Sequence, residues 1–335
     1  MQAKVSKIKE VVLEKIYSPV AEPGKAVVNV YAVGICGSDV HIYLGENPVI
    51  KPPWVCGHEF GGVIKSLSEV DRENSKFNIG DKVVVNPVIN CGFCYYCRHE
   101  AEHMCENQQV IGGTQDGAMK EEILVPIKNL VRLNDSFDLL YSPIIEPLAV
   151  AIHAIGQIKN SNIVIIGLGT VGLLEQQICI MNGNKVFALD INNFSLELSM
   201  KLGACSAINF NEILKNNHFE KFFCGKKIDI VVDNVCSKET LKFSLDIVRK
   251  KGRIVLVGIP SKNFEINILK FLCNEIIMTS SYLYRDSEFI RAANYISENK
   301  IDFNSIISKV FPLNLISKAF EYKINHPSIK VIIKI

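Results

Sequence analysis

Residues 162–172 read NIVIIGLGTVG, and this stretch decides the fold of the second half of the chain. Its residues 163–166 form a continuous apolar run, which is typical of a strand buried on both faces. Three glycines follow with the spacing Gly-x-Gly-x-x-Gly, and a helical pattern covers about Val171 to Met181. A glycine turn between such a strand and a helix indicates a dinucleotide site, because the turn and the helix N-terminus offer N–H groups and positive charge to phosphates.

Asp190 supports this interpretation and points to NAD. It ends the next expected strand, KVFALD, 18 residues after the third glycine. Its carboxylate can accept hydrogen bonds from ribose hydroxyls and would repel a 2′-phosphate, and the residues after it supply no arginine for NADP. We expect NAD to bind at Gly167, Gly169, Thr170, Val171, Gly172 and Asp190. A glycine-rich turn without a ligand is the alternative.

The sequence around this motif alternates between strand and helix patterns. After KVFALD come the helix FSLELSMKLG, the short strand AINF, the strand IDIVVDNV, another helix and the strand GRIVLVGI. Such alternation predicts a parallel, doubly wound sheet with right-handed crossovers. We assign residues 143–277 to this α/β domain, which begins with the helical stretch EPLAVAIHAIGQI.

The first part of the chain has a different secondary-structure pattern. Residues 1–142 are rich in short β patterns separated by Gly, Pro and Asn, among them a short strand at Val27–Val30. Residues 278–335 combine a helix, EFIRAANYISENK, with a final strand, KVIIKI. We expect a β-rich domain first, the α/β domain second, and a C-terminal segment that returns to the first.

Composition excludes several classes of protein. The 335 residues carry 37 basic and 35 acidic side chains, and a net charge of +2 gives no electrostatic basis for binding nucleic acid or an anionic membrane. Hydrophobic residues make up 48%, as in globular proteins, which excludes a disordered chain. The longest uncharged apolar run, residues 163–174, is too short to span a membrane, and the N-terminus has no signal-peptide pattern. We expect a cytoplasmic protein.

Four of the eleven cysteines fall within fifteen residues, in the segment CGFCYYC and at Cys105. In a reduced compartment, such clustering indicates a metal site rather than disulfides. Four thiolates around Zn²⁺ make a closed tetrahedral site with a structural role. An iron–sulfur centre is the chemical alternative, and His99 or His103 could compete as ligands. The expected ligands are Cys91, Cys94, Cys97 and Cys105.

Two further segments, GICGSDVHIY (residues 34–43) and CGHEFGG (residues 56–62), place Cys36 and His58 in glycine-flanked positions where functional residues concentrate. Together with the cysteine cluster and the glycine motif, in this order and at this spacing, they resemble the zinc-dependent medium-chain alcohol dehydrogenases over the whole chain. The resemblance implies an α/β protein with a GroES-like β-barrel catalytic domain and a Rossmann domain.

The resemblance also implies a catalytic zinc held by Cys36 and His58. In place of a second cysteine the segment IIEPLAV offers Glu146, as in the polyol and sugar-acid branch of the family. In that branch Glu59 and Glu146 share the zinc, and which of them binds it directly is left open; Glu59 could instead orient His58. An open zinc position would bind the substrate hydroxyl and lower its pKa before hydride transfer to nicotinamide.

Other roles follow from the same resemblance. Ser38 and His41 match the relay that carries the hydroxyl proton to solvent, with a surface role as the alternative for His41. Val257 and Gly258 match backbone that lines the nicotinamide. Sorbitol dehydrogenases have a substrate-contacting arginine where this chain has Tyr282, and Arg285 lies three residues on. A sorbitol substrate is therefore doubtful, and a sugar acid or sugar phosphate remains open.

These observations predict an NAD- and zinc-dependent dehydrogenase with two zinc ions per chain, which oxidises a secondary hydroxyl of a polyol, sugar phosphate or sugar acid to a ketone. The alternatives are an enzyme like L-threonine 3-dehydrogenase, and a non-catalytic NAD-binding relative that keeps only the structural zinc. The expected partner is a small-molecule alcohol, with no nucleic acid and no membrane. The resemblance further suggests a homodimer or homotetramer.

Overall fold

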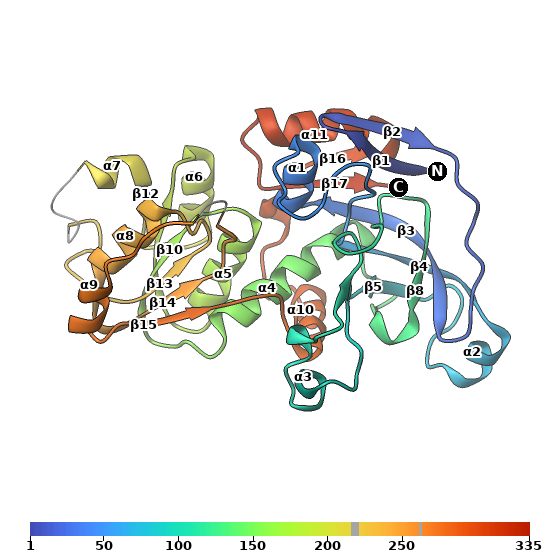
Figure 1. Cartoon of the computed structure of the whole chain (residues 1–335), viewed down its shortest axis with the longest axis horizontal. Coiled ribbons are helices and arrows are strands. Elements are labelled where there is room, and N and C mark those ends of the chain that lie inside the picture. The colour runs from blue at the N-terminus through green and yellow to red at the C-terminus, as the bar shows by residue number, and fades with distance from the viewer. Residues whose placement is uncertain (216–220, 261–262) are drawn as a thin grey trace. The chain divides into compact units, whose positions relative to one another are not determined.

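The computed structural model describes residues 1–215, 221–260 and 263–335, which form two compact units (Figure 1). Unit 1 comprises Met1–Ala149 and Arg285–Ile335, and unit 2 comprises Val150–Tyr284. The strand β15 (Ile277–Ser280) belongs to the sheet of unit 2 and runs across the boundary expected between residues 277 and 278. The residue bounds of the expected domains stay predictions.

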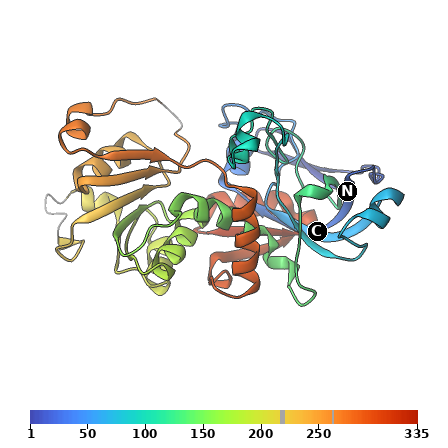
Figure 2. The same cartoon turned by 90° about the horizontal axis from the view of Figure 1, so that it is seen from below.

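Unit 2 contains a six-stranded parallel sheet with the order β12-β11-β10-β13-β14-β15 (Figures 1 and 2). The other strands are β10 (Asn162–Ile166), β11 (Lys185–Asp190), β12 (Ser206–Asn209), β13 (Ile228–Asp233) and β14 (Val248–Leu256). The chain starts at β10 in the middle, builds outward to β12, and then crosses back to β13. This order confirms the doubly wound fold, whose ligands bind at the carboxyl ends of the strands where the order reverses.

The helices of unit 2 follow its strands in turn and pack on the sheet. They are α5 (Thr170–Met181), α6 (Asn193–Lys201), α7 (Phe210–Leu214), α8 (Lys238–Ile247) and α9 (Ile268–Cys273). Residues 163–166 of β10 are at most 1% exposed, so the strand is buried on both faces, as its continuous apolar run predicts.

Unit 1 contains a sheet with the order β16-β17-β3-β4-β5-β9, and β8 also pairs with β3. The strands are β3 (Lys25–Ile35), β4 (Phe60–Leu67), β5 (Lys82–Val85), β8 (Glu122–Pro126), β9 (Leu130–Arg132), β16 (Ile307–Pro312) and β17 (Lys330–Lys334). Expected as a short strand at Val27–Val30, β3 is eleven residues long. Two register shifts against β4 let it bend.

One edge of β3 carries two partners, and this arrangement positions the candidate active site. Residues 25–29 of β3 pair with β8, whereas residues 32–35 pair antiparallel with β17 near the C-terminus. The pairing sets Val331 opposite Ile35. Residues that are about 300 positions apart in sequence therefore meet beside Cys36.

The rest of unit 1 is made of small elements around this sheet. The strands are β1 (Gln2–Lys7), β2 (Glu10–Glu14), β6 (Val88–Ile89) and β7 (Gln109–Val110). The helices are α1 (Gly37–Leu44), α2 (Glu69–Asn74), α3 (Tyr95–Arg98), α10 (Asp286–Ser297), α11 (Ile316–Asn325) and α4 (Ile145–Ile155), which runs past Ala149 into unit 2. Among the described residues, no helix has the length and apolar character needed to cross a membrane.

Candidate metal centres and active site

Cys36 lies between the end of β3 and the first turn of α1, where it is the N-cap residue. The neighbouring Asp39 is fully buried, and its Oδ2 accepts a hydrogen bond of 2.9 Å from the Cys36 backbone N–H. Its Oδ1 accepts a second bond, 3.3 Å long, from the Gly57 N–H and lies 3.9 Å from Nδ1 of His58. One carboxylate therefore ties the Cys36 segment to the His58 segment.

Cys36, His58 and Glu59 are brought together as possible metal ligands. The thiol sulfur of Cys36, a ring nitrogen of His58 and a carboxylate oxygen of Glu59 all lie within 4.8 Å of one another. Glu59 is buried against Gly34, where an added Cβ would lie 2.0 Å from the Glu59 Oε2. Only glycine at position 34 leaves room for this carboxylate.

Lys330, the first residue of β17, is a member of the site that the sequence did not reveal. It is 1% exposed, and its Nζ donates to Oε1 and Oε2 of Glu59 at 2.7 and 2.6 Å. Lys323 of α11 lies close by, and its Nζ donates to the carbonyl oxygens of Ser328 and Ile329. Burial and then the charge of Lys330 lower the pKa of Lys323 to about 8.

The electrostatics of the site favour a cation. Burial by itself would lower the pKa of His58, but the charges of Cys36, Asp39 and Glu146 together raise this pKa well above its usual value. Glu146, in the first turn of α4, is 6% exposed and is close enough to act on both His58 and Lys330. The acidic groups around His58 thus create a site that would stabilise a bound cation.

This donor set fits Zn²⁺. Thiolate, imidazole and carboxylate are all zinc ligands. Around a tetrahedral ion they would stand about 3.4–3.8 Å apart, which fits the limit of 4.8 Å within which these three atoms lie. Glu59 belongs to the compact group of three, whereas Glu146 does not. Three protein ligands would leave the open fourth position that a catalytic zinc needs.

The four clustered cysteines form a second centre. One sulfur from each lies within 4.8 Å of the other three, with 3.5 Å between Cys94 and Cys97 and 3.9 Å between Cys91 and Cys97. Four thiolates around one zinc would be about 3.8 Å apart. Backbone N–H groups of Phe93 and Cys94 lower the pKa of Cys91 to about 6, which favours the thiolate that a metal binds. His99 and His103 are outside this group of four.

Ser38 and His41 occupy α1 beside Cys36, three residues apart and so on one face of the helix. Ser38 is half-buried, whereas the His41 side chain is 60% exposed and its Nδ1 lies 3.0 Å from the Glu46 carboxylate. The progression from a half-buried hydroxyl to an exposed imidazole suits a relay to solvent, although their catalytic roles stay predictions.

The dinucleotide motif has the expected geometry. Gly167 follows β10 with a φ of +89°, and an added Cβ at Gly172 would lie 1.9 Å from the Gly167 carbonyl oxygen. Both positions therefore require glycine. At Gly169, the N-cap of α5, an added Cβ would meet no atom within 4 Å. The space above this turn is open where a pyrophosphate would approach the N-terminus of α5.

Asp190 ends β11 as expected and helps to hold the glycine turn. Its Oδ2 accepts a 2.6 Å hydrogen bond from the Leu168 N–H, and its Oδ1 accepts one of 2.8 Å from the Asn192 N–H. Each carboxylate oxygen can accept a further bond, so both remain available to ribose hydroxyls. Val257 and Gly258 follow β14 and donate their N–H groups to the Asp233 carbonyl oxygen.

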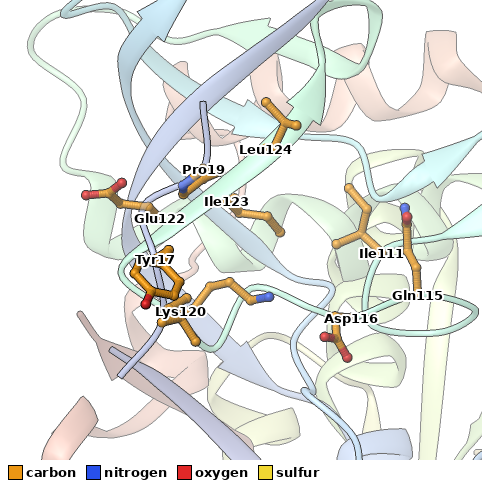
Figure 3. Close-up of a pocket in the computed structure, with 10 residues that line it drawn as sticks. Tyr17, Pro19, Ile111, Gln115, Asp116, Lys120, Glu122, Ile123 and Leu124 are labelled. Carbon is orange, nitrogen blue, oxygen red and sulfur yellow. The ribbon is translucent and has the colours of Figure 1, made fainter. Parts of the chain in front are cut away.

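A cavity of about 410 Å³ lies elsewhere on unit 1 (Figure 3). Its lining includes Tyr17 from the N-terminal segment, Asp116 and Lys120 from the stretch before β8, and Glu122, the first residue of β8. Lys120 extends toward the side of Asp116 (Figure 3). None of the expected catalytic or metal-binding residues lines this cavity, so we do not assign it to the reaction.

Two regions of the chain match known protein families. Residues 22–135 match the alcohol dehydrogenase GroES-like domain, and residues 170–298 match the zinc-binding dehydrogenases. The starvation-sensing protein RspB of Escherichia coli K12 is 31% identical over 306 residues, which cover 90% of this chain and 88% of RspB. The chain belongs to the zinc-dependent medium-chain alcohol dehydrogenases. The resemblance seen in its sequence is thereby confirmed, and this dehydrogenase is an oxidoreductase.

Other relatives of this dehydrogenase have named substrates. Sorbitol dehydrogenase of Bacillus subtilis is 28% identical, over 93% of this chain and 90% of the relative. L-Threonine 3-dehydrogenase of Caldanaerobacter subterraneus is 29% identical, over 94% and 92%. A solved structure of the alcohol dehydrogenase RspB from Escherichia coli CFT073, complexed with NADH, superposes with a TM-score of 0.91 at 28% identity and covers 100% of this chain and 98% of that one. These likenesses confirm the GroES-like and Rossmann architecture.

Proposed function

We propose that this dehydrogenase uses NAD and two zinc ions per chain to oxidise a secondary hydroxyl of a polyol, sugar phosphate or sugar acid reversibly to a ketone. The observation that carries the substrate class is the composition of the open site. It combines one thiol and one imidazole with the buried carboxyl groups of Glu59 and Glu146, and Glu59 lies within the compact donor group. A sorbitol dehydrogenase among the relatives supports the same class.

The residues of the site have distinct roles in this proposal. Cys36, His58 and Glu59 would hold the catalytic zinc, with Glu146 beside them, and the four clustered cysteines would hold the structural zinc. When bound, the catalytic zinc lowers the pKa of the substrate hydroxyl, and NAD accepts the hydride. Ser38 accepts the hydroxyl proton, and His41, which is exposed, passes it to water.

A screen of substrates and cofactors tests the proposal. NADH formation would be followed at pH 8 with zinc-loaded enzyme and sorbitol, galactonate, idonate, galactitol 1-phosphate and L-threonine, each with NAD and with NADP. We expect turnover with at least one polyol, sugar acid or sugar phosphate and a preference for NAD. Turnover with threonine alone would show that the chain is instead an L-threonine 3-dehydrogenase. One relative with that activity is 29% identical to this chain. No turnover together with one zinc per chain would indicate the non-catalytic alternative.

Replacing Asp190 by Ala is expected to weaken NAD binding about tenfold or more and to relax the discrimination against NADP. The change removes an acceptor for the ribose hydroxyls and also the bond that holds the Leu168 N–H in the glycine turn. Titration of each cofactor by fluorescence checks this, with Glu197→Ala, on the exposed side of α6, as the control. An unchanged ratio of NAD to NADP affinity would show that Asp190 does not contact the ribose.

We also propose that the enzyme forms a homo-oligomer through unit 2. The edge strand β15 and the nearby α9 expose large apolar side chains, namely Ile268, Leu269, Leu272 and Ile277, each more than half exposed. An exposed apolar sheet edge favours pairing with a second copy about a two-fold axis. Sedimentation velocity should show a dimer or tetramer that Leu269→Glu dissociates, whereas the exposed-site control Leu214→Glu should not. A monomeric wild-type chain would refute this assembly.

A further inference from the structure

A buried carboxyl group lies behind the glycine turn, in the helix α5. The side chain of Glu175 is fully buried, three residues after Gly172. Its Oε2 accepts a 2.6 Å hydrogen bond from Nδ2 of Asn234, while its Oε1 has no hydrogen-bond partner within the described parts of the chain. Glu175 is absent from every ion pair found among those residues.

This environment keeps Glu175 neutral at pH 7. Burial raises the pKa of Glu175 to about 8, and the hydrogen bond from Asn234 offsets only part of the rise. Among the described residues, no cation contributes to the shift in the pKa of Glu175. Burial and the nearby Glu175 raise the pKa of the Cys179 thiol on the same helix, and burial raises the pKa of Asp233, the residue next to Asn234 on β13.

Asn234 connects the turns that form the cofactor site. Its backbone N–H donates to the Ile166 carbonyl oxygen, at the end of β10. A Cβ at Gly167 would lie 3.2 Å from the Asn234 Cβ, and a Cβ at Gly258 would lie 2.5 Å from the Asn234 carbonyl oxygen. Asn234 is thus packed between the glycine turn and the turn of Val257 and Gly258, and its side chain ties both to α5.

We propose that Glu175 is a positioning residue whose bound proton is required for tight binding of the dinucleotide. This inference rests on the proposed use of NAD and adds a proton linkage to that site. Glu175 lies within the first two turns of α5, the helix whose N-terminus would face the pyrophosphate of a bound dinucleotide. An ionised carboxylate there would cancel part of the positive potential at the helix N-terminus and would repel the phosphates through the protein interior. Its charge would also be buried without a cation beside it, which costs free energy.

The pH dependence of NADH affinity tests the proposal. If the neutral form binds and the ionised form does not, the dissociation constant of NADH should rise about tenfold from pH 7 to pH 9 for a group with a pKa of about 8. The variant Glu175→Gln keeps an oxygen that accepts from Asn234 and cannot ionise, so its NADH affinity should stay constant over this range. The control Glu197→Gln, on the exposed side of α6, should keep the wild-type profile.

Thermal unfolding of the cofactor-free protein separates this proposal from the proposed use of NAD. Because the pKa of Glu175 is higher in the folded chain than in the unfolded one, the wild type should lose stability relative to Glu175→Gln as the pH rises from about 5 to 8, and the difference should then level off. If the stability difference between wild type and Glu175→Gln appears but NADH affinity is independent of pH, the proposed link between Glu175 protonation and cofactor binding is wrong, and the proposed use of NAD is unaffected. If the stability difference appears but NADH does not bind at any pH, the proposed link and the proposed use of NAD are both wrong.

Discussion

Replacing Cys36 by Ser is expected to lower turnover by at least about a thousandfold and to remove one zinc ion per chain. The serine hydroxyl ionises far less readily than a thiol, so the compact group of three donors loses the ligand that best holds zinc. Loss of the metal removes the polarisation of the substrate hydroxyl, which contributes several kcal/mol to such reactions. Initial rates and zinc content by mass spectrometry check both expectations.

Two controls make this result specific. Cys205→Ser changes an exposed thiol outside both centres and should leave turnover and zinc content unchanged. The circular dichroism spectrum of Cys36→Ser should match that of the wild type, because the closed cysteine centre is intact. Unchanged turnover in Cys36→Ser would overturn the assignment of the catalytic centre.

Replacing Lys330 by Met is expected to lower the unfolding temperature by roughly 10 °C, because it leaves the buried Glu59 carboxylate without its cation. Both side chains are almost completely buried, with 2% and 1% of their side-chain surfaces exposed. Breaking such a pair costs about 3–5 kcal/mol, whereas removing both charges costs much less. The double variant Glu59→Gln/Lys330→Met should therefore be more stable than Lys330→Met alone.

Zinc binding gives a second readout for Lys330. With Lys330 absent, Glu59 no longer shares its negative charge with the lysine, so Lys330→Met should also change zinc affinity, while Lys330→Arg should stay close to the wild type. Lys309→Met, on the exposed surface of β16, is the matched control. If Lys330→Met were as stable as this control, the ion pair would not have the importance that its burial indicates.

The fold of unit 2 could be predicted because its signals are local. The apolar run of β10, the glycines and the alternation of strands and helices each lie within short windows. These patterns marked five of the six parallel strands, from β10 to β14, whereas no pattern marked β15. The length of the strand β3 was underestimated because the C-terminal half of β3 is buried at nearly every position. An alternating apolar and polar pattern is therefore absent from this half.

The candidate site was predictable only where its residues carry a motif. Cys36, His58 and the four clustered cysteines have characteristic spacing, whereas Lys330 has none. Lys330 reaches Glu59 because β17 pairs with β3, a contact between the two ends of the chain.

Asp39 had a weak signal in the sequence, because an acidic residue three positions after an N-cap is common at helix starts. That it also binds the Gly57 N–H depends on tertiary structure.

X-ray absorption spectroscopy at the zinc edge tests the central claim most directly, because it counts the sulfur ligands of bound zinc. A closed centre of four thiolates and an open centre with one thiolate predict two zinc ions per chain and an average of about 2.5 sulfur ligands per zinc. Four sulfur ligands per zinc, with one zinc per chain, would contradict the account, because the Cys36, His58 and Glu59 group would then hold no metal in the native enzyme.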